Sequence, residues 1–597
     1  MPFEGDSIKL VPKLRQAIQQ AFLAIYDLPL SEEACSLQVT RKEFQGTFSL
    51  PVFSFAKRCN VPPVELATQI GQWLQTHTNL IASYNVISGF LNLVLHDAIW
   101  LSILTAIAAD STYGHLARRM RHIVVEFSSP NTNKPQHLGH LRNNFLGSSL
   151  AAILDAAGYT IHKVNLINDR GIHICKSMVA YQQFGGDETP ENTGIKGDHL
   201  VGKYYVKFDQ VYKAERALME KNGEDATVPP ILQRAQNMLV EWEKGNPDVV
   251  ALWKKMNGWV YDGFNATYAE LGITFDKIYY ESEAYLLGKT IIEEGLDQKI
   301  FYKREDGAIA VDLSKQGLGE KVLLRKDGTA VYITQDLGIA DLRYADYHFD
   351  QMIYVVGNEQ AYHFKVLFAI MTELGRPYAS SMHHFPYGMV DLPDGKMKSR
   401  EGNVVDADNL IQEMIDTVGD YMKTADKVTK CSEEGLQKLH HTLAIGALKF
   451  FLLRVSPQKK MLFNPNESID LQGDTGTFIQ YTYARICSLT RKAQFVPKVP
   501  LDESTSGSLS PLEQTLIFQL YRLPETIEEA AVAYMPSIIA HYALELAKTY
   551  NKFYASHLIL RESNANAKAI RLLLSFCVGK VLKKSMALLT IELPEKM

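Results

Sequence analysis

The pattern of apolar positions predicts a strand–helix–strand unit between residues 123 and 167. The β-branched run 123–125 is typical of a short buried strand, and a turn-rich segment at 128–135 follows it. From His137, apolar residues recur every three to four positions, which predicts a helix that ends near Gly158. A second strand is expected at 160–167. In such units, ligands bind at the carboxyl ends of the strands and at the start of the helix.

The same reading divides the whole chain into six segments. We predict a multidomain α/β fold, with a doubly wound, Rossmann-like catalytic domain that carries insertions, an N-terminal α/β domain and a C-terminal α-helical bundle. The predicted boundaries are 1–112 for the N-terminal domain, 113–184 for the first half of the Rossmann domain, 185–328 for an insertion that is helical and then β-rich, 329–409 for the second half, 410–470 for a helical connection and 471–597 for the helical bundle.

Composition and charge indicate a soluble globular protein without a general nucleic-acid-binding coat. The chain has 597 residues, 46% hydrophobic and 22% charged, with a formal net charge of −5. Its six cysteines form no C-x-x-C pair, which argues against a disulfide framework or a cysteine zinc site. The longest apolar run, 98–109, is too short to span a bilayer, and the first residues lack a signal segment. We therefore expect a cytoplasmic protein with no membrane partner.

The start of the first predicted helix carries the strongest candidate chemistry. His137 and His140 lie three residues apart in its first turn, and Gly139 between them lets a ligand approach the backbone closely. The free N–H groups of a helix start favour an anion, and Lys134 adds a positive charge just upstream. Taken alone, H-x-G-H is equally consistent with two histidines that only cap or pack a helix.

The neighbouring residues favour one family. The pattern E-F-S-S-P-N-x-x-K-P-x-H-x-G-H resembles the ATP-binding signature of class I aminoacyl-tRNA synthetases, in the form found in arginyl-tRNA synthetases. A basic loop at 395–405 resembles their second signature, K-M-S-K-S, at Lys396 and Met397. Ser399 stands where that pattern has its second lysine, and the resemblance implies that Lys134 replaces it.

The resemblance implies a role for each of a set of polar residues. It implies catalytic roles for Lys134, His137, His140 and Lys396. ATP would contact Lys134, His137, Gly139, His140, Lys396 and Met397. Arginine would contact Glu126, Asn131, His137, Glu281, Tyr332, Asp336 and Gln360. Independently of the family, carboxylates and a flat aromatic ring suit a guanidinium, and Tyr332 and Asp336 are four residues apart on one helix face. Any one of these acids taken alone would more simply be a surface ion pair.

The resemblance also implies an activity and its partners. It implies an arginine–tRNA ligase that uses ATP with bound Mg²⁺, holds no zinc or other protein-bound metal, and acts as a monomer on L-arginine and tRNA(Arg). Residues 1–112 would contact the corner of the tRNA. Tyr481 and Arg485, four residues apart on a helix of the slightly basic segment 471–597, suit stacking on bases and holding phosphates.

Two other classes of function remain open from the residues. One is a different nucleotidyltransferase, which the loop at Lys396 and the long helical C-terminal segment disfavour. The other is a synthetase-like binding protein without activity. The presence of His137, His140, Tyr332 and Asp336 argues against the second class, because loss of activity usually erodes such residues.

Overall fold

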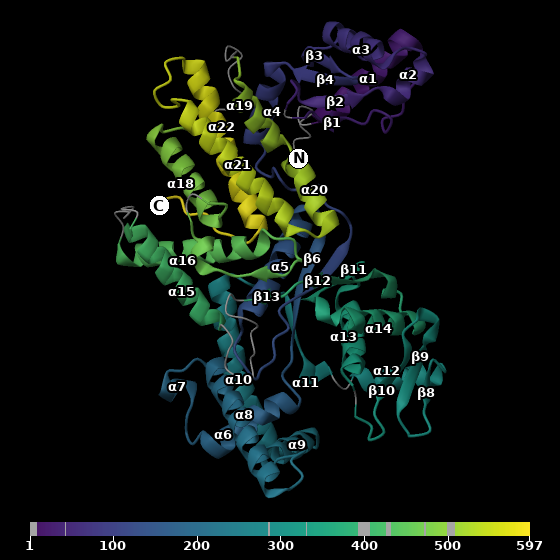
Figure 1. Ribbon diagram of the computed structural model, residues 1–597, viewed down its shortest axis with the longest axis vertical. Helices are drawn as coiled ribbons and strands as arrows, with labels where there is room; N and C mark the ends of the chain where they lie inside the picture. The colour runs from purple at the N-terminus through teal and green to yellow at the C-terminus, as the bar shows by residue number, and fades with distance from the viewer. Residues whose placement is uncertain are drawn as a thin grey trace.

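The computed structural model shows an elongated molecule with its parallel sheet near the centre (Figure 1). The N-terminal domain projects at one end beside the C-terminal helices, and two insertions extend at the other end. The structure describes residues 9–41, 43–284, 287–329, 331–391, 406–424, 432–470, 473–497 and 508–597.

Five parallel strands form the central sheet, in the order β12-β11-β5-β6-β7. β5 is the first of these five strands along the chain and lies in the middle of the sheet. The later strands are therefore added outward, first on one side of β5 and then on the other. This is the doubly wound topology that the sequence predicts, and it opens a crevice between the carboxyl ends of β5 and β11. The strands are β5 (His122–Glu126), β6 (Thr160–Ile167), β7 (Lys277–Tyr280), β11 (Gln351–Gly357) and β12 (Met382–Tyr387).

Alternate residues of the central strands face two separate cores. Val125 and Val355 pack in the cluster that contains α5 (Leu138–Ala156), whereas Val124 and Tyr354 pack in the cluster that contains α13 (Tyr332–Tyr347) and α14 (Ala361–Glu373). Because successive strand side chains point to opposite faces, continuous apolar runs are needed where both faces are covered by helices. Both faces of the sheet are therefore buried.

Two insertions leave this sheet, and β7 separates them. A helical group lies between β6 and β7, and a three-stranded antiparallel sheet, β10-β9-β8, follows β7. The sequence prediction treated 185–328 as a single insertion, but the structure places β7, within that range, at the edge of the central sheet beside β6. Three of its four residues are only partly buried, and Tyr279 alone is fully buried, so β7 lacks the apolar run that marked the inner strands. The remaining elements are α6 (Ile172–Phe184), α7 (Pro190–Thr193), α8 (Gly197–Asn222), α9 (Pro230–Glu243), α10 (Pro247–Leu271), α11 (Glu281–Ala284), α12 (Leu287–Asp297), β8 (Phe301–Lys303), β9 (Ile309–Leu313), η2 (Ser314–Gln316), β10 (Gly319–Leu324), η3 (Asn358–Gln360), η4 (Ala379–Ser381) and β13 (Val390–Asp391).

The N-terminal domain packs helices on an antiparallel sheet of order β1-β2-β4-β3. It contacts the C-terminal helices through an edge-to-face pair, Phe48 with Phe518, whose ring centroids lie 5.6 Å apart. Its elements, with the helix that leads to the central sheet, are α1 (Leu10–Tyr26), β1 (Gln38–Val39), β2 (Phe48–Pro51), α2 (Phe53–Cys59), α3 (Pro63–His77), β3 (Ile81–Ile87), β4 (Phe90–Leu95) and α4 (Asp97–Ala109).

The C-terminal helices pack around α5, so the signature helix is buried between the sheet and the bundle. The buried Arg142 guanidinium of α5 donates to the carbonyls of Pro457 and Lys459, at 3.1 and 2.9 Å. Ser149 of α5 donates to the carbonyl of Leu588 at 2.8 Å. The elements are α15 (Ala407–Thr424), α16 (Glu433–Leu453), β14 (Met461–Leu462), α17 (Pro465–Ser468), α18 (Gly476–Lys492), α19 (Pro511–Tyr521), α20 (Leu523–Ala533), α21 (Pro536–Ser556) and α22 (Ala565–Leu588).

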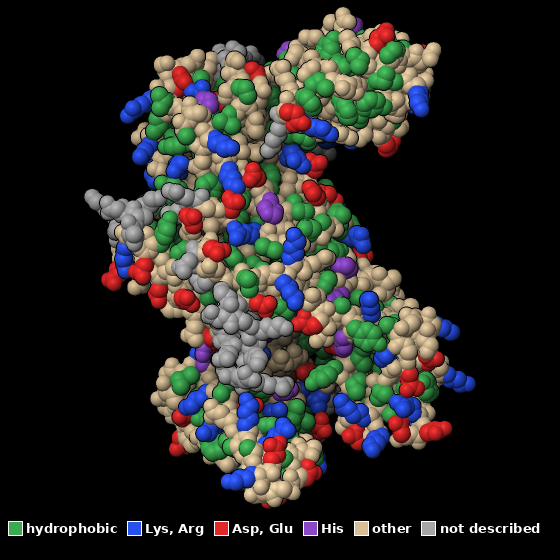
Figure 2. Space-filling model, viewed as in Figure 1, with side chains coloured by type: hydrophobic (Ala, Val, Ile, Leu, Met, Phe, Trp, Pro, Cys, Tyr) green, Lys and Arg blue, Asp and Glu red, His purple; other side chains and the backbone are tan. Residues whose placement is uncertain are grey.

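The surface carries mixed charge on the face shown in Figure 2. Basic and acidic side chains are interspersed over the insertions and the C-terminal helices. Among the described residues, no helix is both long and apolar enough to cross a membrane.

Candidate active site

The loop after β5 begins with two serines in the left-handed region of backbone space. Ser128 has a φ of 78° and Ser129 a φ of 46°, a conformation that costs non-glycine residues free energy and that concentrates at functional sites. Two buried amides hold it in place. Ser128 N donates to Asn143 Oδ1 at 2.5 Å, and Ser129 N donates to Asn165 Oδ1 at 3.0 Å. Asn143 also donates to the carbonyl of Val355 on β11, so α5 fixes the loop at the point where the strand order reverses.

His137 and His140 cap the start of α5 with their Nδ1 atoms. His137 Nδ1 accepts from Gly139 N at 3.2 Å, and His140 Nδ1 accepts from His137 N at 3.1 Å. A neutral imidazole that accepts at Nδ1 carries its proton on Nε2. Each ring therefore has an Nε2–H available as a donor, and the capping and ligand-binding interpretations of H-x-G-H are compatible.

Both histidines are neutral near pH 7 in this structure. Burial and the nearby charge of Lys134 lower the pKa of His137 to about 3. Burial, His137 and Lys134 lower the pKa of His140 well below its usual value. The pair can donate hydrogen bonds to a phosphate while positive charge comes from lysine side chains.

Gly139 leaves room for the His137 ring. A Cβ at this position would lie 3.0 Å from His137 Cε1 and 3.1 Å from His137 Nδ1. Its backbone φ is not in the left-handed region, so the requirement for glycine here is space rather than conformation.

A cavity of about 210 Å³ opens beside His137, against the insertion helix α8. Gly202 of α8 packs so tightly on Pro135 that a Cβ there would lie 2.8 Å from Pro135 Cδ. Basic and imidazole side chains from two distant segments therefore share one cavity, which suits an anionic ligand. Its polar lining residues are Lys134, Gln136, His137, His199, Lys203, Tyr205 and Asp406.

The far wall of this cavity is fixed by a network around Asp408, at the start of α15. Its carboxylate accepts from Lys196 Nζ at 2.5 Å, His199 Nε2 at 2.9 Å and Thr267 Oγ1 at 3.0 Å. Ala407 N donates to the carbonyl of Gln136 at 3.0 Å. Helices α8 and α10 thereby hold α15 against the histidine turn.

Asp198, His199 and Asp408 lie close enough together to hold a metal ion. The ammonium of Lys196 lies beside both carboxylates, 3.4 Å from Asp198 Oδ2, and already supplies a positive charge to the cluster. The arrangement is explained by ion pairing, and no metal role is assigned to it.

Across the crevice, Glu126 forms an ion pair with Arg343 of α13, and both side chains are buried. Ser129 Oγ donates to the other Glu126 oxygen at 3.1 Å, and the Arg343 guanidinium lies over the rings of Tyr279 and Tyr354. Burial raises the pKa of Glu126, and the charge of Arg343 opposes that rise. The carboxylate expected to contact arginine thus already has a cationic partner, and its contact with substrate stays a prediction.

Asp336 lies at the start of α13 and faces α14. His363 Nε2 donates to Asp336 Oδ2 at 2.6 Å. Tyr332, one turn before Asp336, is 71% exposed, and Gln360 is exposed just before α14. Tyr332 thus lies one turn before Asp336 and Gln360 one turn before its partner His363, and the contacts of these residues with arginine stay predictions.

Glu281 approaches the same corner from the end of β7. It is buried, and burial, together with the charges of Asp169 and Asp336, raises its pKa to about 7, while Arg170 opposes the rise. Asp169 holds this segment in place, because its carboxylate accepts from Ser282 N at 2.8 Å and Tyr261 OH at 2.8 Å. Asn131 is exposed on the loop after β5, where it pairs with Asn168.

The two remaining groups of predicted residues lie elsewhere. Lys396 and Met397 fall outside the described residues, so their predicted contacts with ATP stay predictions. Tyr481 and Arg485 lie together on α18, with the guanidinium carbon 4.9 Å from the ring centroid. Arg485 also lies over Tyr554 and donates to Asn551 Oδ1 at 2.7 Å, so internal packing already orders it.

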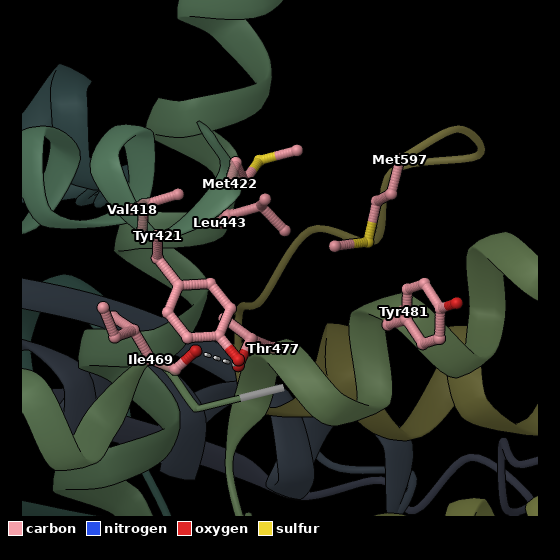
Figure 3. Close-up of a pocket in the computed structure, with 8 residues that line it drawn as sticks. All are labelled: Val418, Tyr421, Met422, Leu443, Ile469, Thr477, Tyr481 and Met597. Carbon is pink, nitrogen blue, oxygen red and sulfur yellow. Dashed lines mark hydrogen bonds between the residues drawn. The ribbon is translucent and has the colours of Figure 1, made fainter. Parts of the chain in front are cut away.

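Tyr481 also lines a small apolar cavity between α15, α16 and α18. Figure 3 shows Tyr421 and Met422 on one side of the cavity and Met597, at the end of the chain, on the other. Side chains hold the backbone of the C-terminal segment there. For example, Gln480 Nε2 donates to the carbonyl of Glu592 at 2.9 Å.

Comparison with known proteins decides the family. A family model described as tRNA synthetases class I (R), catalytic domain, matches residues 102–464. A DALR anticodon binding domain model matches 479–597, and an arginyl tRNA synthetase N terminal domain model matches 12–95. The chain belongs to the arginyl-tRNA synthetase family.

Relatives of this synthetase family are similar over their full length. An arginine–tRNA ligase of Amoebophilus asiaticus is 55% identical over 590 residues, covering 98% of this chain and 99% of the relative. The arginine–tRNA ligase of Bacteroides thetaiotaomicron is 48% identical, covering 99% of this chain and 100% of the relative. The Thermus thermophilus arginyl-tRNA synthetase structure has the same fold, with a TM-score of 0.76, 23% identity, and coverage of 98% of this chain and 99% of that one. The predicted family and fold class are confirmed.

Sequence reasoning missed four polar residues that the structure places at this synthetase site. Arg343, His199 and Asp408 were not singled out at all, because their partners are far away along the chain. His363 follows the predicted residue Gln360 by three positions, but nothing in the sequence showed that it contacts Asp336.

Proposed function

We propose that this chain activates L-arginine with ATP to form arginyl-adenylate and transfers the arginyl group to the 3′ end of tRNA(Arg). The observation that carries the proposal is the convergence of two sets of residues on one crevice. Neutral histidines that can donate from Nε2 lie at the start of α5, and an acidic corner with an exposed tyrosine lies across the switch point of the sheet.

Adenylate formation needs positioned donors rather than a protein nucleophile. The substrate carboxylate attacks the α-phosphate of ATP, a new P–O bond forms, and the bond to pyrophosphate breaks. Neutral Nε2–H groups of His137 and His140 can stabilise the charge on the phosphates, and Lys134 and Lys396 add positive charge. Gly139 and Met397 complete the proposed ATP contacts. The proposal includes Mg²⁺ that arrives bound to ATP, and neither zinc nor a metal held by the protein.

The acidic corner suits the guanidinium of arginine. Asp336 would accept its N–H groups, Tyr332 would stack on its plane, and Glu281 would add a second acid. Asn131, Glu126 and Gln360 would hold the α-amino and carboxylate end or form the adjacent pocket wall, with Glu126 kept in place by Arg343. His137 would also contact the substrate.

The helical domain and the N-terminal domain supply the proposed tRNA contacts. The ring of Tyr481 is partly buried and lines the same cavity as Met597, and the guanidinium of Arg485 lies over that ring. An ordered ring with a neighbouring guanidinium suits stacking on an unpaired base. We place the enzyme in the cytoplasm as a monomer, with residues 1–112 contacting the tRNA corner.

Aminoacylation of total bacterial tRNA tests the proposal. Labelled arginine, lysine and glutamine are supplied in parallel with ATP and magnesium. Charging with arginine alone is the expected result. Charging with another of these amino acids would overturn the arginine assignment, and no charging with any of them would favour a binding protein without catalysis.

A further inference from the structure

Asp336, the acid proposed to hold the substrate guanidinium, is already hydrogen-bonded to the imidazole of His363. His363 Nε2 lies 2.6 Å from Asp336 Oδ2, and both side chains are partly exposed, at 27% and 32%. Because a carboxylate only accepts hydrogen bonds, the imidazole must be the donor. The hydrogen bond to Asp336, together with its charge, raises the pKa of His363, and burial opposes that rise.

The pair joins two helices that border the crevice. Asp336 lies one turn into α13, and His363 lies in the first turn of α14. Both lie close to exposed residues of the same corner, because Tyr332 precedes Asp336 by one turn and Tyr362 precedes His363 directly. Tyr332 is 71% exposed and Tyr362 is 56% exposed. A ligand that enters this corner therefore meets the pair from solvent.

Other titratable groups surround the pair, but Asp336 is the charged group that shifts the pKa of His363. Asp336 raises the pKa of Glu126, Glu281 and Tyr354, which places those three groups within its electrostatic reach. Glu126 is neutralised by Arg343. On β12, His384 stacks on Phe364 and has a lowered pKa. On β10, Lys321 lies over the ring of Tyr362, and Glu359 lies on η3 before α14. Asp336 is thus the charged group that acts on His363.

We propose that His363 is a positioning residue that neutralises Asp336 in the free chain, and that the guanidinium of arginine takes over this role. The inference rests on the function proposed above. When arginine binds, its guanidinium and a protonated imidazole would both lie against one carboxylate. Two cations at this distance repel, and only the imidazolium can lose a proton near neutral pH. The proton passes to solvent, and His363 remains as a neutral donor that orients Asp336.

The sign of the resulting pH dependence follows by linkage. The free chain binds more protons than the arginine complex, so arginine binding releases a proton. Affinity for arginine must then fall as the pH falls through the pKa of His363 in the free chain. For one proton, the dissociation constant rises at most about tenfold per pH unit. The affinity for ATP has no reason to follow this slope.

Calorimetric titration of the full chain with arginine tests the proposal. Measurements in buffers of different ionisation enthalpy, between about pH 6 and pH 8, give the number of protons released. We expect release that approaches one proton for the wild-type chain and none for His363→Gln, whose amide donates to Asp336 without titrating. His383→Gln is the matched control, because His383 lies on β12 beside Tyr534 with a lowered pKa and should behave as wild type.

The outcomes separate the two proposals. Arginine binding with equal proton release by wild type and His363→Gln, or with none by wild type, overturns the role of His363 and leaves the proposed function standing. Absence of arginine binding at every pH overturns both. If His363→Gln does not fold, steady-state kinetics of the wild-type chain at several pH values test the proposal instead. The KM for arginine must rise as the pH falls while the KM for ATP does not. Parallel changes in the two KM values overturn the proposal.

Discussion

Glu126 and Arg343 form a buried ion pair between the end of β5 and the second half of α13. Side-chain exposures of 7% and 2% leave almost no water around the pair. Two tyrosine rings, Tyr279 and Tyr354, cover the guanidinium. The pair joins the strand that leads into the histidine signature to the helix that carries Asp336.

Removing one partner of this pair should destabilise the protein strongly. Arg343→Met leaves the Glu126 carboxylate buried without a cation, which typically costs about 3–5 kcal/mol. The double variant Glu126→Gln/Arg343→Met should recover much of that loss. Urea unfolding of the wild type, the two single variants and the double variant checks this. Additive losses in the double variant would show that the two side chains do not act as a pair.

Substitution of Asp336 should damage arginine use and spare ATP. Asp336→Asn keeps the shape but removes the charge that answers the guanidinium, and we expect the KM for arginine to rise on the order of 10²-fold. The measurement is pyrophosphate exchange with arginine and ATP varied separately. Asp341→Asn, on the same helix but paired with Arg376, is the control. A wild-type KM for arginine in Asp336→Asn would exclude the assigned role.

The two nitrogen atoms of His137 should be separable by substitution. Asn places its oxygen near the position of Nδ1 and can keep the cap, whereas Gln places its amide near the position of Nε2 and can keep the donor. We expect His137→Asn to retain stability but lose on the order of 10² in adenylate formation. His137→Gln should retain more activity and less stability. The reverse order in melting temperature and exchange rate would contradict the tautomer assigned here.

Lys134 should contribute to rate rather than to folding. Lys134→Ala removes a positive charge from the cavity beside His137, and we expect adenylate formation to slow by about ten- to a hundredfold with little change in melting temperature. Lys221→Ala, at the exposed end of α8, is the matched control. An unchanged exchange rate in Lys134→Ala would mean that this lysine does not replace the one missing from the second signature.

The Asp408 network should give a stability contribution that depends on pH. Burial opposes ionisation of Asp408, but hydrogen bonds from His199 and Lys196 outweigh it and lower its pKa to about 2. The hydrogen bond to Asp408 raises the pKa of His199. The Asp408 contribution is present above the unfolded pKa of a carboxyl and is lost as the pH falls towards 2. The His199 contribution is present below about pH 6.5 and is lost as the pH rises through its folded pKa.

Asp408→Asn therefore should destabilise the protein more near pH 5.5 than near pH 8.5. We expect a loss on the order of 2 kcal/mol at the lower pH, measured by urea unfolding at both. His199→Gln should remove most of the difference between the two pH values. A loss that is the same at both pH values would show that His199 does not contribute through its charge.

The sequence alone determined the local elements and the chemistry of one turn. The strand at 122–126, the helix from 138 and the strand at 160–167 follow from runs of apolar residues, because both faces of the central sheet are buried. The histidine signature and the predicted pair Tyr332 and Asp336 could also be found in the sequence, because each set lies within a few residues of chain, and the role of that pair stays a prediction. The edge strand β7 was not recognised, because a short and partly exposed strand has no such apolar run.

Only the tertiary structure decided which side chains became partners. Glu126 with Arg343, Asp336 with His363, and Asp408 with His199 are separated by tens to hundreds of residues, and no periodicity links them. Their contacts depend on the order of strands in the sheet and on how closely α8, α13 and α14 approach it. Burial then sets the charge of each group, since the cost of an ion depends on the water and the partners left around it.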